Sequence, residues 1–181
     1  MNAPRTSEDR IREHFGRLYA LFAPSVVTDA AAYLDALTVT AGQHGHAADP
    51  DHVGMLAQVA AEVTPRKYHR PSEERSGTEV YEMLGILRKA FEAAGLTIAG
   101  SQVRMGAAVE PLEGGPVWGW DGKAGLSVAL YSDSGWELMV NQPQTRIFSI
   151  YAPVTVDGAA EVAAIVRSIL TGETPDPFRN R

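Results

Sequence analysis

The chain has 181 residues, 45% of them hydrophobic and 21% charged, with a formal net charge of −6. This composition is typical of a globular protein and excludes an intrinsically disordered chain. There is no cysteine, which excludes disulfides, zinc–thiolate sites, iron–sulfur clusters and cysteine nucleophiles. The N-terminus lacks the layout of a signal peptide, and no apolar run reaches the roughly 18 residues of a membrane helix. We therefore expect a soluble, cytoplasmic protein that does not contact a membrane.

Two amphipathic helices are predicted before residue 43. The first begins at Thr6, which forms a capping-box pattern with Asp9, and ends at Pro24. Its apolar residues recur at helical spacing and are Ile11, Phe15, Leu18, Tyr19 and Phe22. The second helix is expected to run from near Thr28 to Gly42. Its inner face consists of Ala30, Tyr33, Leu34 and Leu37.

A third helix is predicted to begin with Asp49 as its cap and Pro50 at its first position. We expect it to end at Thr64 and to bury an apolar row made of Met55, Leu56, Val59 and Val63. Residues 65–77 follow, with two prolines, a glycine and several charges, which is typical of a linker. The chain is thus predicted to divide into a helical segment 1–64, a linker 65–77, an α+β domain 78–172 and a flexible tail 173–181.

The second half of the chain is predicted to be a helix, an antiparallel sheet and a helix. The first of these helices is capped near Thr78, closes at Gly95 and buries Val80, Leu84, Leu87 and Phe91. Strands are expected at 97–105, 117–120, 126–131, 136–141 and 146–151, and a last helix runs from Asp157 to Gly172. The last three strands have short connections, which require antiparallel pairing. The fold class is therefore α+β, an N-terminal helical segment followed by helix, meander of four or five strands, and helix.

The three strongest strands are apolar on both faces. One face carries Leu126, Val128, Leu130, Trp136, Leu138, Val140, Arg146, Phe148 and Ile150, and the other carries Ala129, Tyr131, Met139, Ile147 and Tyr151. A sheet with two apolar faces needs a cover on both. The second cover is either the N-terminal helices or another molecule, which favours an interface or a homodimer.

Several aromatic residues fit such an interface. Trp118 and Trp120 would share one face of a strand, and Gly119 between them permits close approach of a ligand. Large aromatic residues are preferred anchors at protein interfaces. We therefore predict an interaction surface formed by Trp118, Trp120, Trp136, Tyr131 and Tyr151, with packing in the core as the alternative role of the tryptophans.

A histidine cluster offers a second hypothesis. His44, His46 and His52 lie around a predicted loop and the first turn of the third helix. Imidazoles placed together bind divalent transition metals. The alternative is a polar loop whose acidic residues cap the following helix.

A short basic run offers a third hypothesis. Arg66, Lys67 and Arg70 flank Tyr68 in the predicted linker. Basic side chains beside an aromatic ring can contact phosphates and stack on a base. The overall acidity of the chain argues against a nucleic-acid partner, and a solvated connector is the alternative.

The dinucleotide fingerprint, the phosphate-binding loop and the nucleophile elbow are all missing from the sequence. The sequence therefore favours a protein that is not an enzyme and needs no cofactor. The leading hypothesis is an accessory protein, immunity-like or regulatory, that binds a protein partner. A metal-binding protein or metal-dependent enzyme is the first alternative, and a nucleic-acid-binding regulator is the second.

Overall fold

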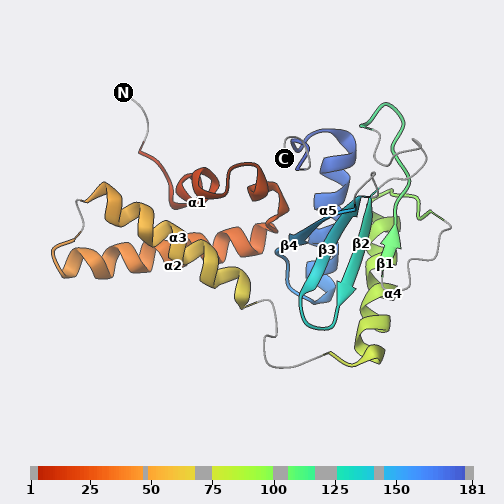
Figure 1. The fold of residues 1–181 in the computed structure, drawn as a ribbon, viewed down its shortest axis with the longest axis horizontal. Coiled ribbons are helices and arrows are strands. Elements are labelled where there is room, and N and C mark those ends of the chain that lie inside the picture. Colours follow the sequence, from red (N-terminus) through yellow and green to blue (C-terminus); the bar gives the residue numbers. More distant parts are fainter. Residues whose placement is uncertain are drawn as a thin grey trace.

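The computed structural model describes residues 4–46, 49–67, 75–99, 106–116, 126–140 and 145–177 (Figure 1). The helices are α1 (Ser7–Phe15), the 3₁₀ helix η1 (Gly16–Leu21), α2 (Pro24–Gln43), α3 (Pro50–Arg66), α4 (Gly77–Ala93) and α5 (Val156–Thr171). The strands are β1 (Gly106–Ala108), β2 (Ser127–Tyr131), β3 (Gly135–Val140) and β4 (Arg146–Ile150). The predicted α+β class, with helices first and then helix, antiparallel meander and helix, is confirmed.

Local capping chemistry starts the helices. Thr6 caps α1 in a reciprocal capping box with Asp9, and Asp49 caps α3 ahead of Pro50, both as predicted. Helix α4 starts two residues earlier than expected, because Ser76 rather than Thr78 is its cap and Glu79 closes a second capping box. Each cap satisfies backbone amides that would otherwise lack partners at a helix start.

Two helix boundaries near the N-terminus differ from the prediction. The first helix is interrupted at Gly16, whose φ of 53° lies in the left-handed region, and continues as the 3₁₀ helix η1. Helix α2 begins at Pro24 rather than near Thr28. Proline lacks the amide that a first-turn position leaves unpaired, so Pro24 starts a helix here instead of only ending one.

The sheet is an antiparallel meander in the order β1-β2-β3-β4. Strands β2, β3 and β4 coincide closely with three predicted strands, whereas β1 lies just beyond the predicted strand 97–105. The register places Val128 opposite Leu138 and Leu138 opposite Phe148, so one face is a continuous apolar layer. Residues 100–105 and 117–120 lie outside the described residues, so the structure does not describe most of two predicted strands.

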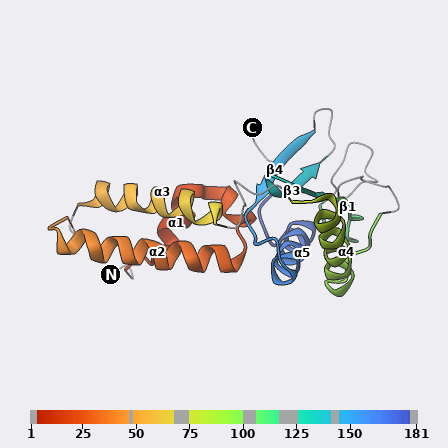
Figure 2. The ribbon, with the colours of Figure 1, turned by 90° about the horizontal axis from the view of Figure 1, so that it is seen from below.

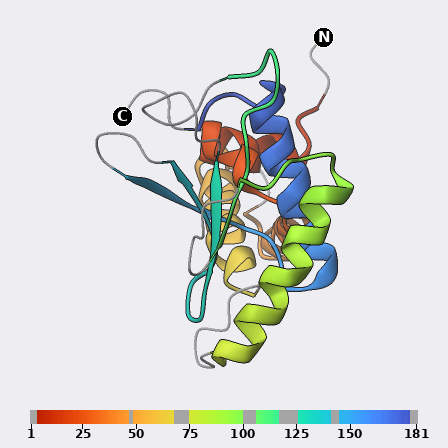
Figure 3. The same cartoon turned by 90° about the vertical axis from the view of Figure 1, so that its right-hand side faces the viewer.

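Helices α4 and α5 cover this apolar face together (Figures 2 and 3). The predicted stripes of both helices are buried, with Leu87, Phe91, Val166 and Ile169 each fully excluded from solvent. Trp136 lies in the same core at 0% exposure, and its Nε1 donates a hydrogen bond of 3.1 Å to the Pro153 carbonyl. Figure 2 shows that the N-terminal helices lie beside the sheet, beyond β4, and not over its second face.

The junction between the N-terminal helices and the sheet runs along β4. The Tyr151 amide donates to the Leu21 carbonyl at 2.9 Å, and the Ala23 amide donates to the Tyr151 carbonyl at 2.8 Å. The Phe22 ring stacks on the Tyr151 ring with centroids 4.6 Å apart. The segment between η1 and α2 thus continues the sheet past β4 in a parallel bridge.

Helix α3 buries a different face from the one predicted. Its side toward the other N-terminal helices carries Leu56, Ala57, Ala60 and Ala61, all buried. Met55, Val59 and Val63 were expected to be buried with Leu56, but they are 53%, 37% and 38% exposed. The predicted row was wrong for these three because Leu56 and the small Ala57, Ala60 and Ala61 form the contact with the other helices.

The segment predicted as a linker is held at its far end. Arg75 is only 7% exposed, and its amide and guanidinium both donate to the Ser132 carbonyl, at 3.3 and 3.1 Å. At its near end, Pro65 and Arg66 belong to α3. Within the described part of the chain, no helix is both long and apolar enough to cross a bilayer.

Candidate functional site

The second face of the sheet, called the outer face here, is the first candidate. It is defined by the residues whose side chains alternate away from α4 and α5. These are Ala108, Ser127, Ala129, Tyr131, Glu137, Met139, Ile147 and Ser149. Figures 1 and 2 show no described helix or strand over this face. Ile147 is 50% exposed, Tyr131, Glu137 and Met139 are half-buried, and Ala108 and Ala129 are buried.

Glu137 is the one charged residue among the described residues of the outer face. It lies on the central strand β3, between Ala129 and Ser149 in the register. Its Oε1 accepts a hydrogen bond of 3.0 Å from the Ser134 hydroxyl. When a partner removes the remaining water from a half-buried carboxylate, an unpaired charge is costly, so a cation on the partner is favoured.

Both edges of the sheet are partly closed within the described residues. Just past the end of β4, Tyr151 forms one isolated bridge with residues 21–23. Beyond β1, the Ala99 amide donates to the Ala108 carbonyl and the Glu110 amide donates to the Thr97 carbonyl, both at 2.9 Å. A peptide that adds a strand needs a free edge. The outer face itself offers contact through its side chains.

The aromatic residues predicted as an interaction surface are not all on this face. Trp136 is in the core and Tyr151 packs on Phe22, whereas Tyr131 does lie on the outer face. Trp118 and Trp120 lie outside the described residues. The sequence could have indicated Glu137, because an acidic residue among alternating apolar positions of a strand marks the face that is not core.

The predicted histidine cluster is only partly assembled. The His46 and His52 rings stack with centroids 5.3 Å apart, which joins the end of α2 to the first turn of α3. His44 and His46 are exposed and His52 is half-buried. In the described ranges, no three His, Cys, Asp or Glu side chains are grouped so that they could hold one metal ion.

The predicted basic run is described only in part. Arg66 and Lys67 are exposed at the end of α3, and Arg70 lies outside the described residues. The Lys67 ammonium lies 5.9 Å from the centre of the Tyr33 ring. This cation–π contact holds the Lys67 side chain against α2. Lys67 therefore has a structural role that does not depend on contact with a phosphate.

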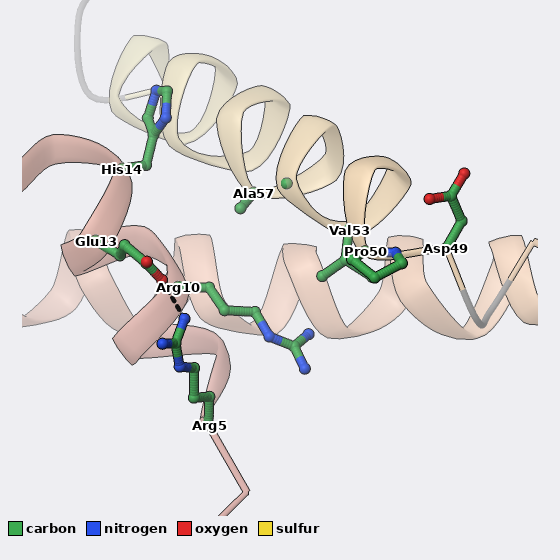
Figure 4. Close-up of a pocket in the computed structure, with 9 residues that line it drawn as sticks. Arg5, Arg10, Glu13, His14, Asp49, Pro50, Val53 and Ala57 are labelled. Carbon is green, nitrogen blue, oxygen red and sulfur yellow. Dashed lines mark hydrogen bonds and ion pairs between the residues drawn. The ribbon is translucent and has the colours of Figure 1, made fainter.

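A cavity between α1 and α3 is a second candidate, which no pattern in the sequence indicated (Figure 4). Its volume is about 500 Å³, which is within the range of small-molecule sites. One wall is apolar, formed by Pro50, Val53, Gly54 and Ala57 of α3. The other wall is polar, formed by Arg5, Arg10, Glu13 and His14 from the α1 region.

The charges around this cavity are unevenly compensated. Arg5 and Glu13 form an ion pair of 2.6 Å. Arg10 reaches from α1 toward the N-terminal half of α3 and points away from His14 (Figure 4). Its guanidinium has no hydrogen-bond or ion-pair partner among the residues that the structure describes. Asp49 lies at the far end of the cavity, as the cap of α3. The geometry suits a ligand that combines an anionic group with an apolar body.

Comparison of the chain with protein-family models, with curated proteins and with solved structures finds no match.

Proposed function

We propose that this protein is a non-catalytic binding protein that holds a protein partner against the outer face of its sheet. The observation that carries the proposal is the asymmetry of the sheet. Helices α4 and α5 cover one face, the N-terminal helices lie beyond the β4 edge, and the outer face keeps Ile147 half exposed. Apolar side chains on a face without a described cover are typical of an interaction site.

The proposed partner presents an amphipathic segment with a basic residue. Its apolar side packs on Tyr131, Met139 and Ile147, and its lysine or arginine pairs with Glu137 in the centre of the face. Charge complementarity supports this choice, because the outer face carries one carboxylate and no described cation.

Site-specific photo-crosslinking in the cells that naturally make the protein tests this proposal. A photo-reactive phenylalanine analogue is placed at Ile147 and, as a matched control, at Tyr81, which is 78% exposed on α4. We expect a discrete adduct with one other protein from position 147 and none from position 81. Glu137→Lys should abolish the adduct, whereas Glu92→Lys on the exposed side of α4 should leave it unchanged.

Three results would overturn the proposal. They are the absence of an adduct from position 147, the same adducts from positions 147 and 81, and an adduct only with a second copy of the chain. A partner identified by its adduct is then purified, and its association rate should fall as salt rises, because salt screens the long-range attraction to the Glu137 carboxylate.

A second candidate function is the binding of a small amphipathic anion in the cavity between α1 and α3. It is favoured by the Arg10 guanidinium beside the apolar wall of α3. Octanoate serves as the probe, followed by the amide NMR signals of Val53 and Ala57. A Cβ added at Gly54 meets no atom within 4 Å, so Gly54→Leu should fill the cavity without disturbing α3.

We expect octanoate to shift these signals and Gly54→Leu to abolish the effect. Gly85→Leu is the matched control, since Gly85 is also an open helical position but lies on α4. Arg10→Gln should lower the affinity for octanoate by about tenfold, which is the usual cost of losing one charge-assisted hydrogen bond. Equal binding of octanamide, or binding that survives Gly54→Leu, would remove this candidate.

A further inference from the structure

Another cavity lies where the N-terminal helices meet the segment that follows α5. Its volume is about 410 Å³, which is within the range of small-molecule sites. Arg12 of α1 and Arg17 of η1 line it, together with the apolar side chains of Ala20 and Phe22, and Thr174 lies on the opposite wall. No acidic side chain of the described residues lines this cavity. Its chemistry therefore favours an anionic ligand that also has an apolar part.

Arg12 is held in place on one wall of the cavity. Its guanidinium carbon lies 4.7 Å from the centre of the Tyr19 ring. Glu8 accepts a hydrogen bond of 3.3 Å from Nη2 of Arg12 and another hydrogen bond from the Tyr19 hydroxyl. Because a guanidinium carries five N–H groups, other N–H groups of Arg12 are left for a ligand. A side chain that is already positioned loses little conformational freedom when it binds an anion.

The other walls of the cavity are also fixed by contacts within the chain. Phe22 is only 5% exposed, and its ring stacks on the Tyr151 ring with centroids 4.6 Å apart. The Thr174 amide donates to the Ser168 carbonyl at 2.9 Å, and the hydroxyl oxygens of these two residues are 2.8 Å apart. The apolar floor and the wall after α5 are therefore formed before any ligand binds.

We propose that this cavity binds a phosphate monoester with an apolar body. Arg12 and Arg17 place two positive charges on the cavity, and a phosphate monoester carries a charge of about −2 at neutral pH. A guanidinium binds phosphate through two parallel N–H···O bonds, which a carboxylate with one charge could use at only one of the two arginines. The apolar body of the ligand packs on Ala20 and Phe22.

Such a ligand contacts η1 and the segment after α5 at once, so it holds the N-terminal helices on the sheet. The Tyr151 amide donates to the Leu21 carbonyl and the Ala23 amide donates to the Tyr151 carbonyl at this junction. Both amides exchange with solvent when the junction opens, and a ligand that binds only the closed form slows that exchange. The cavity shares no lining residue with the cavity between α1 and α3 and includes no residue of the outer face. The inference is therefore independent of the proposed function.

Phenyl phosphate serves as the probe, followed by the amide NMR signals of Ala20 and Thr174. We expect it to shift both signals and to bind at least about tenfold more tightly than inorganic phosphate, which lacks the apolar body. At ten times its Kd it should slow amide hydrogen exchange of Ala23 and Tyr151 by about tenfold. No shift at about 10 mM phenyl phosphate, or equal binding of benzyl alcohol or of inorganic phosphate, would overturn the proposal.

Arginine variants test which site holds the probe. Arg12→Gln and Arg17→Gln should each lower the affinity for phenyl phosphate by at least about tenfold, because each removes charge-assisted hydrogen bonds. Arg88→Gln, at an exposed site on α4, is the matched control and should have no effect. Arg10→Gln should also have no effect, and a loss confined to this variant would place the probe in the cavity between α1 and α3. Equal effects of Arg12→Gln and Arg88→Gln would equally overturn the proposal.

Filling the cavity provides a test that leaves the charges in place. Ala20→Leu should abolish binding of phenyl phosphate, because the larger side chain occupies the space of the apolar body. Ala36→Leu, at an exposed site on α2, is the control and should leave the affinity unchanged. Far-UV circular dichroism of each variant checks that the fold is kept. Undiminished binding by a folded Ala20→Leu protein would overturn the site.

Discussion

Glu161 of α5 accepts two hydrogen bonds from Ser25 at the start of α2. The Ser25 amide donates to Oε1 at 3.2 Å, and the Ser25 hydroxyl donates to Oε2 at 2.8 Å. Helix α2 has no side-chain cap of its own, since Ala23 stands at the cap position. A carboxylate 136 residues away thus satisfies a free amide of α2 and complements its dipole.

Glu161→Ala should therefore destabilise the folded protein by about 1.5–3 kcal/mol, the usual loss for hydrogen bonds to a charged group. Urea denaturation followed by far-UV circular dichroism measures the change in unfolding free energy. Glu92→Ala, at an exposed site on α4, is the control and should change it by less than about 0.5 kcal/mol. Equal effects of the two variants would contradict a capping role for Glu161.

Two glycines in helices should respond in opposite directions to alanine. A Cβ at Gly158 in α5 would lie 1.8 Å from the Pro153 carbonyl oxygen, which also accepts the Trp136 hydrogen bond. Gly158→Ala should therefore cost about 3 kcal/mol through overpacking. A Cβ at Gly85 in α4 meets nothing within 4 Å, so Gly85→Ala should stabilise by up to about 1 kcal/mol. Thermal denaturation of the two variants compares them, and a stable Gly158→Ala protein would contradict this close approach.

The folded protein should be more stable when Thr64, at the end of α3, is replaced by valine. Its side chain is fully buried, and its Oγ1 has no hydrogen-bond partner among the described residues. Valine has the same shape without the hydroxyl, so Thr64→Val should raise the unfolding free energy by about 1 kcal/mol. Thr38→Val is the control, because the Thr38 hydroxyl donates to the Leu34 carbonyl at 2.8 Å, and it should not stabilise. Chemical denaturation that gives Thr64→Val no advantage over Thr38→Val would argue against an unsatisfied hydroxyl.

The capping box of α1 should make its stability depend on pH. Hydrogen bonds from the Thr6 hydroxyl and the Thr6 amide hold the pKa of Asp9 below its ordinary value of 3.8. The folded pKa is lower than the unfolded one, so the contribution of Asp9 is fully present above the unfolded pKa. It is lost as the pH falls through the folded pKa.

An NMR titration of the Asp9 carboxyl checks this pH dependence. Thr6→Ala should raise the pKa of Asp9 toward 3.8, because both the hydroxyl donor and the fixed geometry of the cap are lost. Thr28→Ala, whose hydroxyl donates to the Pro24 carbonyl, is the control and should leave it unchanged. The same Asp9 pKa in wild type and Thr6→Ala would contradict the capping box.

Short-range chemistry made several elements of this protein predictable from its sequence. The Thr6–Asp9 capping box and the Asp49-Pro50 start of α3 depend on residues within one turn of each other. The order of β2, β3 and β4 follows from their short connections, and the alternation of apolar residues identified the face of Val128 and Leu138. The end of α1 at Gly16 was not predictable in the same way. Glycine can adopt a positive φ, but its presence in a sequence does not require one.

Only the tertiary structure decided which apolar surfaces are covered. Hydrophobicity favoured burial of Met55, Val59 and Val63, but α3 packs through Ala57, Ala60 and Ala61, whose small side chains let neighbouring helices approach closely. The pairing of Tyr151 with residues 21–23 places the N-terminal helices at the β4 edge and leaves the outer face around Glu137 without a described cover. These outcomes depend on contacts between residues far apart in the chain, and no local pattern encodes them.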